Sequence, residues 1–120
     1  MAHKDDPQWL EVDGTSVAPV EVARSFAARS RGLLGRGGLD GALWIEPASS
    51  VHTFRMRFAI DVAFVDRHGR VLRTIAMPPH RLSRIRMRSR VVVEAERGRF
   101  ATWGLRQGGT VALSPVALSR

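Results

Sequence analysis

Two carboxylates inside apolar segments are the residues of this 120-residue chain that could do chemistry. Asp61 lies between Ala59 and Ala63 on the polar face of the segment HTFRMRFAIDVAFVD, and Glu94 directly follows three valines. Aspartate is depleted in strands because its side chain competes for backbone hydrogen bonds, so Asp61 needs a partner or a function. If the fold brought the two carboxylates together, one would raise the pKa of the other, and the pair could serve as the acid and base of a hydrolase.

Asp61 has a structural interpretation as well as functional ones. A buried carboxylate is normally paired, and an arginine on the neighbouring strand, Arg70 or Arg73, could supply the partner. The two flanking alanines would instead leave a depression that a ligand could fill. The reading we favour is a non-catalytic binding domain for a small polar or anionic ligand, or for a protein partner. We expect its pocket or groove to be lined by four residues, Arg29, Arg57, Asp61 and Glu94.

A run of arginines gives the second functional hypothesis. Arg84, Arg86, Arg88 and Arg90 alternate with Ile85, Met87 and Ser89. If this segment is extended, all four guanidinium groups lie on one face, about 7 Å apart, which is near the spacing of phosphates along a single nucleic-acid strand. The alternative is a solvated edge strand that its charges protect from aggregation. Polyanion binding is therefore the runner-up function, and hydrolysis by Asp61 and Glu94 is the third.

Other chemistry finds little support in the sequence. The absence of cysteine excludes disulfides, thiolate nucleophiles and cysteine-ligated metal sites. The four histidines lack metal-ligand spacing, and His52 reads as a rim or core histidine. No nucleophile motif accompanies them. We therefore assign no catalytic residues, no metal and no cofactor.

Composition sets the broad class. A hydrophobic content of 44% and 25% charged residues are ordinary for a globular protein, and the length suits one domain. We expect tails at residues 1–8 and 114–120 around a domain at 9–113. The formal charge of +8 will attract polyanions. The first residues contain no apolar run typical of a signal peptide or a membrane span, which favours a cytoplasmic protein.

The elements that must position these residues follow from periodicity and turn signals. From Phe54 to Phe64 every second residue is large and apolar, which predicts one long central strand. The dipeptide Asp13-Gly14 and the segment Asp66 to Gly69 predict two hairpins. Ser25 can cap a helix that the glycines from Gly35 onward would end. A second short helix is expected between Arg97 and Leu105.

The central segment and the RHGRVL that follows it resemble the signature of the domain of unknown function 192 family (DUF192), an uncharacterised bacterial and archaeal family. Further matches extend the resemblance over about residues 20 to 113. The matching residues are Arg29, Gly32, Leu33, Leu34, Arg36, Gly41, Leu43, Trp44, Val93, Glu94, Gly98, Gly104 and Gly108.

The chain departs from this family pattern at several polar positions. Arg57 and Phe58 replace a lysine and an asparagine, Leu34 replaces a methionine, and Gly109 replaces an aspartate. The resemblance implies a fold and brings no activity with it. From the elements, we predict an α+β fold in which a small, strongly bent antiparallel sheet, or a barrel, is covered by two short helices.

Overall fold

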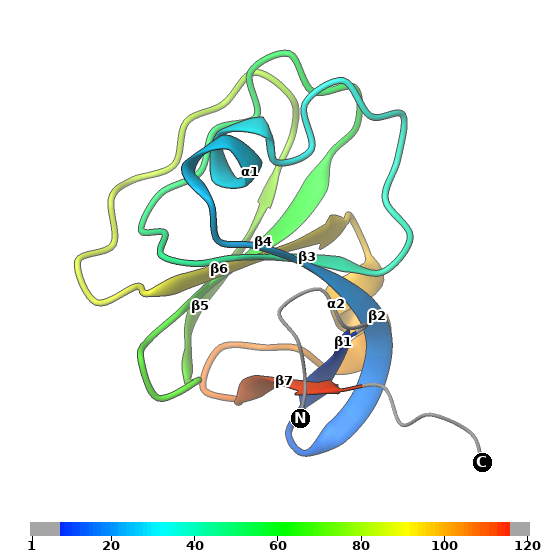
Figure 1. The fold of residues 1–120 in the computed structure, drawn as a ribbon, viewed down its shortest axis with the longest axis vertical. Coiled ribbons are helices and arrows are strands. Elements are labelled where there is room, and N and C mark those ends of the chain that lie inside the picture. The colour runs from blue at the N-terminus through cyan, green and yellow to red at the C-terminus, as the bar shows by residue number, and fades with distance from the viewer. Residues whose placement is uncertain (1–7, 116–120) are drawn as a thin grey trace.

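Residues 8–115 are described by the computed structural model, and they form a curled, seven-stranded sheet with two short helices (Figure 1). The elements in chain order are β1 (Gln8–Val12), β2 (Thr15–Ala23), α1 (Phe26–Arg31), β3 (Ala42–Ile45), β4 (Ile60–Val65), β5 (Val71–Met77), β6 (Val91–Glu96), α2 (Arg99–Trp103) and β7 (Val111–Pro115). Both predicted hairpins are present, as β1–β2 and β4–β5.

The sheet has the strand order β5-β4-β6-β3-β2-β1-β7 and curls into a half-barrel. Its two edges approach each other at a single bridge between Arg70 and Thr110. Beside that bridge the Val71 N–H donates to the Gly109 carbonyl over 2.9 Å, and the Val111 N–H donates to the Gly69 carbonyl over 2.8 Å. The expected strongly bent sheet with two short helices is confirmed in this half-barrel form.

One strand pair corrects the prediction of a purely antiparallel sheet. Strands β2 and β3 run parallel, with Val20 opposite Ala42 and Ala23 opposite Ile45. A parallel pair needs a crossover connection, and α1 lies in the segment between these two strands. The helix is therefore placed over one face of the sheet. That face is the one that holds the candidate site described below.

Alternation of side chains gives the sheet two apolar faces. One face, which α2 covers, carries a cluster that includes Trp44, Val93 and Phe100. The other, which α1 and the following loops cover, carries a cluster that includes Val62 and Phe64. The register sets Asp61 opposite Ala95 on the α2 face, and it sets Glu94 between Leu43 and Val62 on the α1 face.

The prediction of one long central strand from Phe54 to Phe64 is wrong in its first half, because β4 begins only at Ile60. Residues 53–59 are irregular, and Thr53 fixes them: its hydroxyl donates to the Pro78 carbonyl over 2.7 Å and accepts from the Arg81 N–H over 2.8 Å. Arg55, with φ of 63°, departs from extended backbone. Phe54 is consequently 46% exposed instead of lying in the core.

The prediction that the four arginines lie on one face of an extended strand is also wrong. Residues 84–90 form a loop, and β6 starts at Val91. This loop lies alongside the loop after β3. The Ser83 N–H donates to the Val51 carbonyl, and the Arg86 N–H donates to the Ser49 carbonyl, each over 2.8 Å. Arg86 turns inward, with its guanidinium carbon 5.5 Å from the centre of the Phe64 ring. The other three arginines of the run, Arg84, Arg88 and Arg90, are exposed, as is the neighbouring Met87.

Helix α1 begins as predicted but ends early. The Ser25 hydroxyl accepts from the Ala28 N–H over 3.0 Å, which confirms the cap. The helix ends at Gly32, whose φ is 45°, and not at the later glycines. Leu33 therefore follows the helix and packs as a buried loop residue. This early end opens the space beneath α1 that the next subsection describes.

The predicted tails mostly fall beyond what can be described. Residues 1–7 and 116–120 lie outside the described residues, whereas Gln8 belongs to β1, and Ser114 and Pro115 belong to β7. Across residues 8–115, no helix has the length and apolar character needed to cross a membrane.

Candidate functional site

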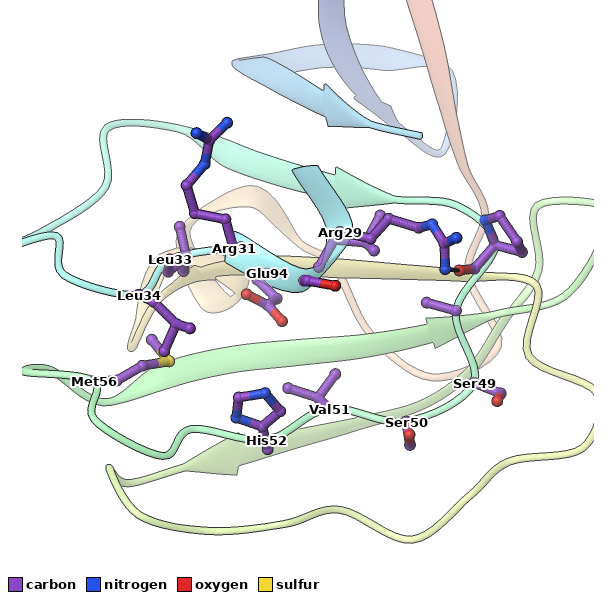
Figure 2. A pocket seen from close by; sticks show the side chains of 15 residues that line it. Arg29, Arg31, Leu33, Leu34, Ser49, Ser50, Val51, His52, Met56 and Glu94 are labelled. Atoms are coloured by element: carbon purple, nitrogen blue, oxygen red, sulfur yellow. Dashed lines mark hydrogen bonds between the residues drawn. The ribbon is translucent and has the colours of Figure 1, made fainter. Parts of the chain in front are cut away.

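A cavity of about 410 Å³ lies between α1, the loop after β3 and the α1 face of the sheet (Figure 2). Helix α1 and the turn after it form one wall, residues 47–56 form the other, and β3 and β6 contribute the floor. The lining residues are Arg29, Ser30, Arg31, Gly32, Leu33, Leu34, Ile45, Pro47, Ala48, Ser49, Ser50, Val51, His52, Met56 and Glu94. The volume is that of a typical small-molecule site.

Glu94 is the charged group on the cavity floor. Its side chain is only 5% exposed, and its carboxylate makes no hydrogen bond or ion pair with any other residue in the described part of the chain. Burial raises the pKa of Glu94 from 4.5 to about 7, and no neighbouring cation opposes this change. In Figure 2 the carboxylate points into the open space facing His52. Glu94 is thus a buried acid whose partner is missing from the described chain.

Arg29 lies at another part of the same cavity. Its Nη1 donates to the Pro47 carbonyl over 3.4 Å, and its Nε is buried without a hydrogen-bond partner among the described residues. Figure 2 shows the side chain extending away from Glu94 toward the loop after β3. Above about pH 7, where Glu94 is ionised, the protein therefore holds two opposite charges apart, each with hydrogen-bonding capacity unused.

The remaining lining is mixed. Leu33, Val51 and Met56 are buried and apolar, whereas Ser50 and His52 are exposed at the mouth. The His52 ring stacks on Phe54, with ring centroids 5.3 Å apart, which confirms His52 as a rim histidine. Within residues 8–115 no group of three or more His, Asp or Glu could hold a metal ion. The cavity therefore presents charged and hydrogen-bonding groups beside a buried apolar patch.

Of the four residues expected to line one pocket, the structure brings only Arg29 and Glu94 together. Arg57 is exposed in the loop before β4 and does not line the cavity. Asp61 faces α2 on the other side of the sheet. Because Asp61 and Glu94 point to opposite faces, the carboxylate pair expected for a hydrolase is not formed.

Asp61 caps helix α2, a role that the sequence did not indicate. Its Oδ2 accepts hydrogen bonds from the backbone N–H groups of Gly98, over 2.9 Å, and Phe100, over 3.1 Å. These are unpaired donors at the start of α2, where the N-cap Gly98 has no side chain to satisfy them. An ion pair with Arg70 or Arg73 is therefore the wrong explanation, and Asp61 caps a helix from a neighbouring strand.

Asp61→Ala should lower the free energy of unfolding by about 1 to 3 kcal/mol, because two helix N–H groups lose a charged acceptor. Urea denaturation monitored by tryptophan fluorescence would measure the loss. Asp40→Asn, which removes an exposed carboxylate, is the control and should change stability by less than about 0.5 kcal/mol. Equal stability of Asp61→Ala and the parent would contradict the capping role.

Several lining residues escaped the sequence reasoning. Met56 lies in the segment predicted to be a strand, and Ser49 and Ser50 precede it without a distinctive motif, so no pattern in the sequence indicated that they converge with α1. A weak signal existed in the cluster Pro47 to Ser50, whose composition is that of a loop near a strand end. Loops next to a rigid sheet are where binding residues concentrate.

Comparison with known proteins places the chain among uncharacterised relatives. Residues 9–113 match the model of the DUF192 family, described as Uncharacterized ACR. A UPF0127 protein from Pyrococcus horikoshii is 32% identical over 84 residues, which cover 66% of this chain and 73% of that protein.

Two solved structures share the fold. A protein of unknown function from Novosphingobium aromaticivorans has a TM-score of 0.73 at 21% identity, covering 88% of this chain and 83% of its own. A Sinorhizobium meliloti protein, named "putative transcription regulator", has a TM-score of 0.73 at 16% identity, covering 93% of this chain and 96% of its own. At these identities both likenesses bear on the fold alone.

Proposed function

This chain belongs to the DUF192 family, and from that premise we propose that it is a non-catalytic binding domain for a small polar ligand held in the cavity beneath α1. The observation that carries the proposal is the Glu94 carboxylate, buried on the cavity floor without a partner among the described residues. Burying such a group costs free energy unless something compensates it. A bound ligand would supply the missing hydrogen bonds.

Binding is favoured over hydrolysis because the cavity lining contains a single carboxylate. Its predicted partner Asp61 is engaged with α2 on the opposite face. The cavity, which is open on one side, also combines buried apolar residues with the charged residues Arg29 and Glu94. The accessible lining of the cavity is more polar than apolar, which favours a small polar ligand over an apolar one.

Polyanion binding through Arg84, Arg86, Arg88 and Arg90 stays a prediction. Exposed arginines in this loop, on a chain of charge +8, support general attraction to nucleic acid. Arg86 packs on Phe64, however, so the regular strip on which that prediction depended is absent. We therefore keep the cavity as the proposed site.

Ligand-observed NMR with a panel of amino acids, polyamines and sugar phosphates tests the proposal. We expect at least one compound to bind the parent and to lose binding in Ser50→Trp, because an indole at the exposed mouth would occupy the cavity. Ala101→Trp places the same indole on the exposed side of α2 and is the matched control. A silent panel, or binding that survives Ser50→Trp, would refute the proposed function.

A further inference from the structure

The two unsatisfied charges of the cavity define the class of its ligand. We propose, on the basis of the proposed function, that the ligand is a small zwitterion with an ammonium group on Glu94 and a carboxylate-like group on Arg29. The acid and the base line one cavity and come from different elements, β6 and α1. They do not pair with each other in the described structure.

The Glu94 end selects a cation. Glu94 is 5% exposed, its carboxylate borders the cavity, and it lacks a protein donor within the described residues, so a ligand in the cavity can provide one. Metal ions in proteins usually take several protein ligands, and the described residues gather no such group around Glu94. An ammonium is compact and carries three donors, so it can satisfy the two carboxylate oxygens and neutralise the charge.

The Arg29 end selects an anion. A guanidinium has donors in a rigid fork that matches the two oxygens of a carboxylate. In the described structure the Arg29 Nε is buried and unpaired, and Nη1 reaches Pro47 only over a long 3.4 Å contact. Because Nε is closed off from the cavity, a ligand carboxylate would contact the terminal nitrogens of Arg29, of which only Nη1 makes this long contact. Ser49 also lines this cavity, near the loop that Arg29 approaches in Figure 2.

The lining between the two ends includes the buried apolar residue Val51, whereas Figure 2 shows Leu33 and Met56 on the side of Glu94 that faces away from Arg29. Methylenes that link the two charged groups of the ligand would contact Val51. Figure 2 shows Arg29 extending away from Glu94, which requires a ligand with separated charges. These features together describe an amino acid whose ammonium and carboxylate groups are linked by methylenes.

Isothermal titration calorimetry with a series of amino acids of increasing length tests this inference. The probes are glycine, β-alanine, γ-aminobutyrate, δ-aminovalerate and ε-aminocaproate, with butylamine and butyrate as analogues that carry one charge each. We expect one member of the series to bind at least about tenfold more tightly than either analogue, because both charged ends contribute.

Single substitutions identify each end. Glu94→Gln should remove the advantage of the zwitterion over butyrate, and Arg29→Gln should remove its advantage over butylamine. Arg88→Gln removes an exposed arginine outside the cavity and should leave the affinities unchanged. Circular dichroism and urea denaturation of every variant would separate lost binding from lost folding.

The contrary outcomes are distinct for the two proposals. Butylamine binding as tightly as the best amino acid, or an Arg29→Gln variant with full affinity, would overturn the zwitterion and leave the cavity as a ligand site. The same applies if the whole amino acid series fails while another panel compound binds and is blocked by Ser50→Trp. If no compound of the amino acid series or of the panel binds, both the zwitterion proposal and the proposed function are overturned.

Discussion

Glu94→Gln is expected to stabilise the ligand-free protein by about 3 kcal/mol at pH 8. In the folded state burial raises the pKa of Glu94 to about 7, compared with an ordinary value of 4.5. Below about pH 4.5 the carboxyl is protonated in both the folded and the unfolded chain, so it does not affect the balance. Between about pH 4.5 and 7 the unfolded chain ionises this carboxyl while the folded chain keeps it protonated, so stability falls by about 1.4 kcal/mol for each pH increment of one. Glutamine carries no such charge.

Urea denaturation of parent and variant from pH 4 to 8 measures this effect. The difference in unfolding free energy should be small at pH 4 and should grow through the window from about 4.5 to 7. Asp40→Asn removes an exposed carboxylate and should follow the parent at every pH. A Glu94→Gln difference that is the same at pH 4 and pH 8 would contradict the raised pKa. A gain in stability together with a loss of ligand is typical of a functional group held in an unfavourable place.

Gly41→Ala should lower the free energy of unfolding by about 3 to 5 kcal/mol, because two independent penalties coincide. Gly41 has φ of +82°, a region that side chains with a Cβ avoid. A Cβ at this position would also run into the Pro19 carbonyl oxygen. The next residue pair, Val20 with Ala42, begins the parallel β2–β3 ladder, so the two strands have no freedom to separate there.

Gly35→Ala is the matched control for this substitution. Gly35 has φ of +78°, yet a Cβ there would meet no heavy atom within 4 Å. Gly35→Ala should therefore lower the free energy of unfolding only by the backbone contribution, about 1 to 2 kcal/mol. The difference between the two variants, measured by urea denaturation, isolates the steric overlap with Pro19. Equal losses in the two variants would show that the overlap is relieved at no cost.

Local signals in the sequence predicted the regular half of this fold. The turn at Asp13-Gly14, the helix cap at Ser25 and the alternation from Ile60 to Phe64 each depend on neighbouring residues, and each is present. Residues 54–59 and 84–90 also alternate in the sequence, yet the chain is irregular in both segments. The reason is tertiary: Thr53 bonds to Pro78 and Arg81, and no local pattern reveals that.

Tertiary structure also explains why only two of the four residues expected at the site lie in the cavity. Glu94 and Arg29 were identified because a charge in an apolar strand and an arginine on a short helix stand out in the sequence. Asp61 stood out equally, but the register that sends it to the α2 face depends on how β4 pairs with β6. A sequence shows which residues alternate within a strand. It does not show which face of the assembled sheet they reach.

The two walls of the cavity differ from its floor in how readily their sequence can be changed. The floor residue Glu94 belongs to β6, in the middle of the ladder, whereas most of the lining belongs to loops and to a six-residue helix. Loops tolerate replacement, insertion and deletion far better than paired strands do. Changes of length or sequence in these walls should therefore alter the shape of the cavity while the half-barrel and Glu94 stay in place.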